Sequence, residues 1–304
     1  MATSIRIGVD FGGTKLEVIA LAADGRELYR RRTATPAGGY DGQMAIVAAL
    51  VTELERAVAA TGTIGVSIPG AISLASGVIK SANSTWLIGR ALDRDLARAL
   101  GRPVPLQNDA NYPAVSEATD GAAAEAEVVF AAILGTGVGA GIVIHGRPLT
   151  GRNAIAGEWG HNQLPWMRDD ERPGPACYCR LRGCIETILS GPGLARDHRE
   201  ATGRDITAKQ IAVLAAQGDV AAEATLRRYE DRLARGLAHV INILDPDVIV
   251  LGGGLSNLDR LYTNVPAIWD RWIFSDRVDT KLRKAKHGDS SGVRGAAWLW
   301  PLEG

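Results

Sequence analysis

The hydrophobic pattern of the first part of the chain predicts a three-stranded meander, then a helix and a buried strand. Apolar stretches bounded by glycine-containing turns place the three strands at residues 5–10, 16–21 and 27–32. Apolar residues then recur with the helical period of about 3.6 residues across 44–60. A further apolar run at 64–68 returns as a buried strand and stops at Pro69-Gly70.

A second strand–turn–strand unit follows later in the chain. Strands are expected at 128–134 and 138–144, on either side of the turn Gly135-Thr136-Gly137. Residues 221–244 carry the helical period, and 248–251 form another short apolar run that ends in glycines. Because the strand–glycine turn–strand pattern occurs twice, the sequence predicts two related α/β domains.

Composition narrows the classes of function. The chain has 304 residues, of which 46% are hydrophobic, so it has material for two domains with sizeable cores. Its formal net charge is zero and it has no long block of like charges, which disfavours nucleic acid as a partner. It has neither the apolar core of a signal peptide nor an apolar run of about 18 residues, so we expect a soluble cytoplasmic protein.

Three glycine-rich turns each follow an apolar strand, at Gly12-Gly13-Thr14-Lys15, Gly135-Thr136-Gly137 and Gly252-Gly253-Gly254. Such turns let backbone N–H groups approach and cradle phosphate, although an ordinary tight turn is the alternative. The first two are neither a Walker loop nor a dinucleotide fingerprint, because a strand follows where those motifs require a helix. Asp10, at the end of the first strand, could hold Mg²⁺ beside phosphates or simply cap its turn.

Two polar stretches suit the phosphorylation of a hydroxyl group. Gln107-Asn108-Asp109-Ala110-Asn111 directly follows an apolar run. Phosphoryl transfer needs a carboxylate that orients the hydroxyl and accepts its proton, which fits Asp109 with Asn108 beside it. A helix cap is the competing interpretation of Asp109. Ala82-Asn83-Ser84-Thr85-Trp86 combines amide, hydroxyl and aromatic groups, as a sugar site or an exposed loop does.

The cysteines are clustered. Cys177, Cys179 and Cys184 are the only three in the sequence, and an odd, clustered set argues for metal or redox chemistry rather than disulfides. Together with His161 they provide the Cys₃His donor set that zinc prefers in closed structural sites. The spacing differs from that of a standard zinc finger, and three small buried residues beside a core histidine are the alternative.

In their order along the chain, these motifs resemble the ROK family of sugar kinases. The motifs are Asp10-Phe-Gly-Gly-Thr-Lys15, Gln107-Asn-Asp-Ala-Asn111, Leu134-Gly-Thr-Gly-Val-Gly139, Gly157-Glu-Trp-Gly-His161, Cys177-Tyr-Cys179 with Cys184-Ile-Glu186, and Leu251-Gly-Gly-Gly254. The resemblance runs from residue 5 to the C-terminus. Within the family, residues 82–86, 157–166 and 286–300 look most like enteric fructokinases that also accept mannose.

The resemblance implies two actin-like, ribonuclease H-like α/β domains with a cleft between them. The expected domains are 1–118 and 119–290, the second with an inserted zinc-binding loop, and a helix at 291–304 is expected to pack back on the first. The resemblance further implies ATP and Mg²⁺ as co-substrate and metal, a structural Zn²⁺, and a homodimer, with no nucleic-acid or membrane partner.

The resemblance also assigns roles to single residues. Asp109 matches the catalytic base. The sugar-contacting positions are Gly70, Asn83, Asn108, Asp109, Glu158, His161 and Glu186. The positions for nucleotide and its metal are Asp10, Gly12, Gly13, Thr14, Lys15, Gly135, Thr136, Gly137, Gly252, Gly253 and Gly254. The zinc ligands are His161, Cys177, Cys179 and Cys184, so His161 would serve both zinc and sugar.

One residue departs from the family pattern, because Arg180 stands where the family usually has glycine. If that turn needs positive φ, arginine strains it, and we expect a modest local adjustment there with the zinc site retained.

The expected reaction is phosphorylation of a hexose at O6, with fructose as substrate and mannose as a secondary one. Kinases of glucose or of an N-acetylated hexosamine such as N-acetylmannosamine are alternatives, because these sugars differ by one or two substituents. A sugar-sensing regulator of the family carries a helix-turn-helix domain, for which a first strand starting at residue 5 leaves no room. A non-catalytic zinc module would not explain Asp109 and the glycine turns.

Overall fold

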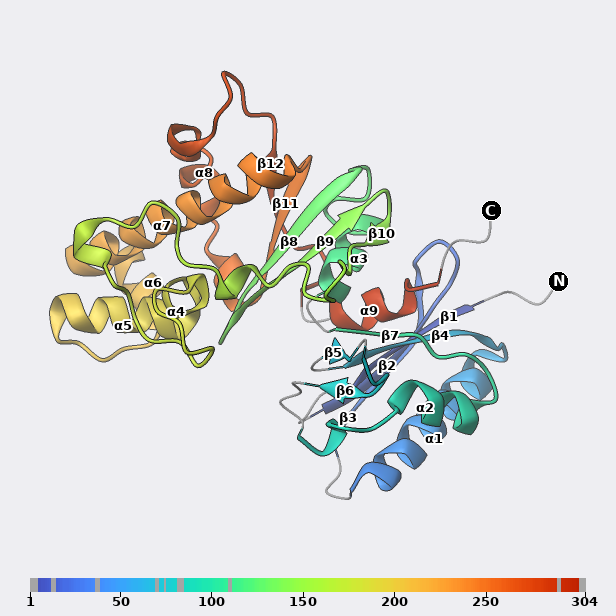
Figure 1. Ribbon diagram of the computed structural model, residues 1–304. Coiled ribbons are helices and arrows are strands. Elements are labelled where there is room, and N and C mark those ends of the chain that lie inside the picture. The colour runs from blue at the N-terminus through green and yellow to red at the C-terminus, as the bar shows by residue number, and fades with distance from the viewer. Residues whose placement is uncertain are drawn as a thin grey trace. The chain divides into compact units, whose positions relative to one another are not determined.

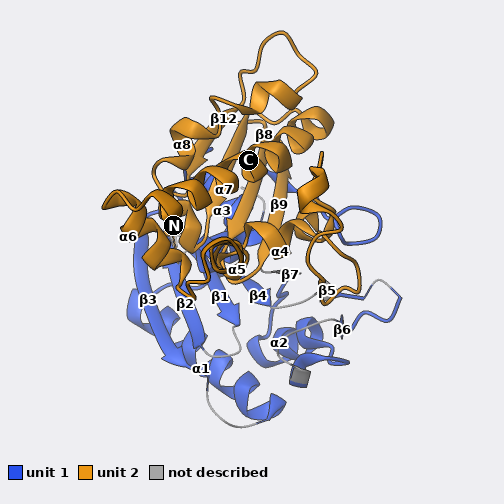
Figure 2. Ribbon diagram, turned by 90° about the vertical axis from the view of Figure 1, so that its left-hand side faces the viewer, with its two compact units in different colours: residues 1–124, 146–156, 289–304 blue, residues 125–145, 157–288 orange. Residues whose placement is uncertain are grey.

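The protein forms two compact units, shown in blue and orange in Figure 2. The computed structural model describes residues 5–11, 15–35, 39–68, 71–73, 75–80, 85–108, 111–288 and 291–300. Unit 1 comprises residues 1–124, 146–156 and 289–304, and unit 2 comprises residues 125–145 and 157–288.

A five-stranded sheet organises unit 1 (Figure 1). In spatial order its strands are β3 (Glu27–Ala34), β2 (Lys15–Leu21), β1 (Ile5–Phe11), β4 (Gly62–Ile68) and β7 (Leu106–Asn108). The predicted meander is confirmed, because β1, β2 and β3 pair antiparallel, whereas β4 and β7 continue the sheet in parallel with β1. The short strands β5 (Ala71–Ile72) and β6 (Ile79–Lys80) form a separate pair.

Helices cover both faces of this sheet. They are α1 (Tyr40–Val58), α2 (Leu92–Leu100), α3 (Asn111–Thr119) and α9 (Ser291–Ala297), with a 3-10 turn η1 (Thr85–Leu87). Successive side chains of a strand point to opposite faces, so Ile7 and Val9 join the core under α1 while Gly8 faces α9. A Cβ atom at Gly65 would lie 2.0 Å from the carbonyl oxygen of Ala296, so glycine is required where α9 meets the sheet.

Unit 2 repeats the sheet pattern of unit 1. Its strands are β8 (Val128–Leu134), β9 (Val138–Ile144), β11 (Val248–Gly252) and β12 (Lys281–Lys284). They lie in the order β9-β8-β11-β12, which matches β2-β1-β4-β7 of unit 1, again with an antiparallel hairpin followed by parallel strands. A short strand β10 (Arg147–Pro148) lies in the 146–156 segment.

The longest described helix is α7 (Val220–Leu244), which carries the core of unit 2 through Leu226, Leu233 and Leu237. Asp219 caps its first turn by accepting a hydrogen bond from the Ala222 N–H at 2.8 Å. The remaining helices and 3-10 turns of the unit are α4 (Ile185–Leu189), α5 (Gly191–Thr202), α6 (Ala208–Ala216), α8 (Leu261–Asn264), η2 (Trp159–His161), η3 (Asp169–Glu171), η4 (Gly254–Asn257) and η5 (Trp269–Trp272). Across the described ranges, none of the helices has the length and apolar character needed to cross a membrane.

Candidate functional site

In unit 1, the carboxyl ends of the parallel strands bring predicted residues to one edge of the sheet. Asp10 of β1 is in register with Ser67 of β4, and Ser67 is in register with Gln107 of β7. Strand β7 ends immediately before Asp109. Asp109, Gly12, Gly13, Thr14, Gly70 and Asn83 lie outside the described residues, as does the side chain of Asn108.

Asp10 is a carboxylate in a desolvated position. Burial raises its pKa above the ordinary value, and the positive charge of Lys15 offsets only part of that shift. Lys15 itself lies 4.0 Å from the carboxylate of Glu17, which is fully buried and also pairs with Arg30 and Arg32. This Glu17 cluster was not predicted from the sequence. A carboxylate that burial destabilises gains from a bound cation, so Asp10 suits a magnesium ion.

In unit 2, the structure brings the four predicted zinc ligands together. The ligand atoms of His161, Cys177, Cys179 and Cys184 all lie within 4.8 Å of one another. Nδ1 of His161 lies 3.6 Å from Sγ of Cys177, and Sγ of Cys179 lies 3.6 Å from Sγ of Cys184. Three thiol groups and one imidazole converging from two loops form the donor set of a tetrahedral zinc site, so the residues present fit this metal.

The turn between the second and third cysteines does require a left-handed residue. Arg180 adopts a φ of 75°, and its N–H donates to the carbonyl oxygen of Cys177 at 3.0 Å. The left-handed region costs a non-glycine residue about 1–2 kcal/mol. Arg180 therefore adopts a conformation that glycine adopts at a lower free-energy cost, and the four ligand atoms remain together.

The loop that carries His161 is held close to β9 by two glycines. A Cβ atom at Gly160 would lie 1.9 Å from the carbonyl oxygen of Val138, and one at Gly157 would lie 2.2 Å from that of Ala140. Between these glycines, Glu158 is exposed and Trp159 is buried. The two neighbouring side chains therefore point in different directions. Glu158 is available for a ligand, and the Trp159 ring is anchored in the core.

Glu186 connects the cysteine loop to the glycine turn between β8 and β9. Its Oε2 accepts a hydrogen bond from the Val138 N–H at 3.0 Å. A Cβ atom at Gly137 would lie 2.6 Å from the same oxygen, so a side chain there would displace the carboxylate. Glu186 follows Cys184 by two residues, and the predicted sugar ligand thus touches the predicted phosphate turn.

An apolar pocket of about 940 Å³ lies on unit 2 beside the glycine turns. Gly135, Thr136 and Gly254, three of the predicted nucleotide positions, line it. Gly252 and Gly253 are not part of its lining. Gly253 has a φ of 80° and packs against the backbone of Leu134, so it shapes the turn instead.

The other walls of this pocket were not predicted from the sequence. They come from the end of β8, the start of α5, α6 with its N-cap, and the residues after Gly254, and comprise Leu134, Gly191, Pro192, Ala195, Thr207, Ala208, Lys209, Ala212, Val213, Ala216, Leu255, Asn257 and Leu258. The Gly191 N–H donates to the carbonyl oxygen of Gly135 at 2.8 Å, which fixes α5 against the turn. The Ser190-Gly191-Pro192-Gly193 sequence is a readable signal for a helix start, since the Ser190 side chain caps α5.

A scan against protein-family models matches residues 6–303 to the model described as the ROK family. The chain belongs to the ROK family. It is 39% identical over 297 residues to an N-acetyl-D-glucosamine kinase of Escherichia coli O6:H1. The matched region covers 96% of this chain and 98% of that kinase.

Solved ROK structures agree with the fold. A ROK hexokinase from Thermus thermophilus superposes with a TM-score of 0.85 at 31% identity, covering 97% of each chain. A ROK family glucokinase from Streptomyces griseus in complex with glucose and AMPPNP gives a TM-score of 0.76 at 28% identity, covering 97% of this chain and 99% of that one. These likenesses and the repeated sheet confirm the expected pair of actin-like α/β domains.

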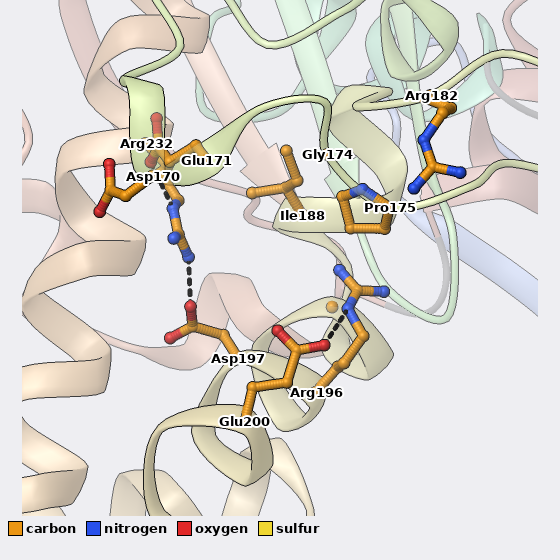
Figure 3. A pocket seen from close by; sticks show the side chains of 11 residues that line it. Asp170, Glu171, Gly174, Pro175, Arg182, Ile188, Arg196, Asp197, Glu200 and Arg232 are labelled. Atoms are coloured by element: carbon orange, nitrogen blue, oxygen red, sulfur yellow. Dashed lines mark hydrogen bonds and ion pairs between the residues drawn. The ribbon is translucent and has the colours of Figure 1, made fainter.

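A network of buried charges holds the loop between His161 and the cysteines of this ROK protein. Arg235, on α7, is almost fully buried and makes a two-point contact with Glu171 at 2.7 Å for each hydrogen bond. Arg232 joins Glu171 to Asp197 of α5. Glu171, Arg232 and Asp197 border a cavity of about 300 Å³. Figure 3 shows Arg232 reaching Asp197 and Arg196 paired with Glu200. The acidic groups at its rim are largely neutralised by arginines, which suits a structural role.

We expect Glu171→Gln to destabilise the protein by about 3 kcal/mol at neutral pH, because Arg235 and Arg232 each lose a charged partner and keep only Asp231 and Asp197. Burial alone would raise the Glu171 pKa, but hydrogen bonds from Arg235 and Arg232 hold it at about 2, below the ordinary 4.5. A depressed carboxyl pKa contributes stability that is complete above pH 4.5 and is lost as the pH falls towards 2.

Denaturant unfolding from pH 7 down to pH 3 measures both effects. The stability of the wild-type protein should fall across the acid range, and that of Glu171→Gln should change less. Asp169→Asn is the matched control, because the Asp169 side chain in the same 3-10 turn is fully exposed. Equal unfolding free energies for the two variants would contradict the assignment.

Proposed function

We propose that the protein transfers the γ-phosphate of ATP to the O6 hydroxyl of a hexose. One observation carries this proposal: in unit 2 a single glycine turn borders the large apolar pocket through Gly135 and Thr136 and touches the Glu186 carboxylate through Gly137. An apolar pocket suits a nucleotide base, backbone N–H groups suit phosphates, and carboxylate and imidazole suit sugar hydroxyls. The kinases to which the chain is similar are named for N-acetylglucosamine, hexose and glucose, and one was solved with AMPPNP.

In this mechanism Asp109 is the general base. A primary hydroxyl is protonated at neutral pH, so its proton must leave as the oxygen bonds to the γ-phosphorus. The hydroxyl proton passes to the Asp109 carboxylate, the bond between the γ-phosphorus and the bridging oxygen breaks, and ADP leaves. Asp10 is the proposed residue for Mg²⁺, whose charge neutralises the phosphates. Lys15 and the turns at 12–14, 135–137 and 252–254 are the proposed nucleotide contacts.

The proposed sugar ligands belong to the two loops of the cysteine and histidine cluster in unit 2 and to the polar segments of unit 1. The proposed contacts are Gly70, Asn83, Asn108, Asp109, Glu158, His161 and Glu186. Zinc, held by His161 and the three cysteines, would supply a rigid link between the loops that carry Glu158 and Glu186. The role of these protein residues is then to fix the hydroxyls so that O6 faces the phosphate.

The hexose is proposed to be fructose, with mannose as a poorer substrate, on the likeness of residues 82–86, 157–166 and 286–300 to fructokinases. The 39% identity to an N-acetyl-D-glucosamine kinase favours a second candidate, N-acetylglucosamine. A coupled assay for ADP with a hexose panel tests both. Fructose should give the highest kcat/KM. A higher kcat/KM for N-acetylglucosamine or glucose refutes only the assignment of fructose as the substrate. If none of the sugars on the panel leads to ADP formation, the proposed kinase activity is refuted.

Asp109→Asn should lower kcat by about 10²- to 10⁴-fold, the usual contribution of a general base. Sugar affinity should change much less, because an amide still hydrogen-bonds a hydroxyl. Steady-state kinetics with the preferred hexose separate the two effects. Asp276→Asn, an isosteric change at an exposed position, is the control and should leave kcat unchanged. Asp109 would be excluded as the base if Asp109→Asn kept more than about a tenth of the wild-type kcat, which is far above the expected residual activity.

Purified protein should contain one zinc per chain by metal analysis. Cys184→Ser should remove the metal and lower the unfolding free energy by more than about 3 kcal/mol, as the loss of a metal site typically does. Sugar affinity should fall in the same variant, because both loops that carry proposed sugar ligands lose their link. Wild-type protein that is free of zinc and fully active would contradict a structural zinc site.

A further inference from the structure

The tyrosine between the first two cysteines contacts the histidine of the cluster. The Tyr178 hydroxyl and Nε2 of His161 are 2.8 Å apart, within hydrogen-bonding distance. The two rings meet edge to face, with centroids 5.0 Å apart and planes at 89°. Tyr178 is nevertheless 79% exposed. It is therefore held over the histidine by little besides this one polar contact.

This contact uses the only polar atom of His161 that the metal site leaves available. Nδ1 of His161 faces the thiol groups, 3.6 Å from Sγ of Cys177. A neutral imidazole that ligates a metal through Nδ1 carries its proton on Nε2 and can donate a single hydrogen bond there. A sugar hydroxyl that binds His161 must therefore accept from the same N–H group that faces the Tyr178 hydroxyl.

Tyr178 stands in the loop that leads from Cys177 to the proposed sugar ligand Glu186, and His161 stands in the loop that carries Glu158. The hydroxyl of Tyr178 thus contacts one proposed sugar ligand, and the two loops that meet there carry two others. These are the loops proposed above to bind a hydroxyl of the hexose.

We propose that Tyr178 covers Nε2 of His161 in the free protein and that a hexose hydroxyl displaces it on binding. The phenol hydroxyl then stands in for the sugar, keeps the N–H group satisfied and lowers the sugar affinity by competition. The exposed ring can move away at small cost, because it gives up one hydrogen bond that the sugar restores to His161. This inference rests on the proposed function, since it requires that a hexose binds at His161.

Isothermal titration of the zinc-loaded protein with fructose, without ATP, tests the exchange. Tyr178→Phe keeps the ring and removes the competing hydroxyl. The net value of one hydrogen bond is about 0.5–1.5 kcal/mol, so the dissociation constant for the sugar should fall by about 2- to 10-fold. Tyr29→Phe is the matched control, because it removes a tyrosine hydroxyl that bonds Glu53 in unit 1, and it should leave the dissociation constant unchanged.

The zinc content of each variant is measured alongside and should equal that of the wild type. Tyr178→Ala, which also lacks the hydroxyl, should tighten binding as well. An unchanged dissociation constant in both Tyr178 variants overturns the exchange, and a higher one in Tyr178→Phe shows that the hydroxyl holds the sugar rather than giving way. If wild-type protein binds neither fructose nor N-acetylglucosamine, the proposed function fails with it. If it binds one of them and the variants do not tighten, only the exchange fails.

Discussion

The close approach of the 157–161 loop to β9 is the constraint on which the rest of the site in unit 2 depends. At Gly157 and Gly160 there is no room for a Cβ atom, since it would meet a backbone oxygen of β9 at about 2 Å. Between them Trp159 is buried against Phe130. With the backbone pinned on both sides and one large ring fixed in the core, His161 has a defined position before any metal binds. The other ligands need only be brought to it.

Hydrogen bonds connect the cysteine loop both to the loop that carries His161 and to the 135–137 turn. The Ile185 N–H donates to the carbonyl oxygen of Asn162, which places Cys184 beside the histidine loop. Glu186 then accepts from Val138, and α5 begins with Gly191 bonded to Gly135. The Cys₃His cluster, the Glu186 carboxylate, the 135–137 turn and the apolar pocket are therefore successive parts of one hydrogen-bonded structure. A displacement of the cysteine loop would be transmitted to the turn over only a few residues.

Local patterns predicted what short stretches of sequence determine. The strands at 128–134 and 138–144 have the expected bounds, because apolar runs ending at glycines specify a buried hairpin. The donor set of the cluster follows from side-chain chemistry alone. Contacts set by strand register or tertiary packing were not predictable. Glu17 lies in an apolar strand, and the arginines that pair with it belong to β3, so only the β2–β3 register brings them together. The α6 wall of the apolar pocket likewise depends on how α6 packs.

The segment between Asn162 and Cys184 contains both the ion pairs of Glu171 and the cysteine cluster, because it has little regular secondary structure to hold it. Apart from η3, this segment has no helix and only isolated strand bridges, so repetitive backbone hydrogen bonds do not hold it. Ordering each residue costs about 1–2 kcal/mol of backbone entropy, which a few van der Waals contacts do not offset. Leu164 and Met167 pack into the core, Arg232 and Arg235 bind Glu171 in the middle of the segment, and the cysteines converge on His161 at its end. Because the Glu171 ion pairs and the Met167 contact involve neither cysteine nor histidine, the middle of the loop keeps its path independently of the Cys₃His cluster.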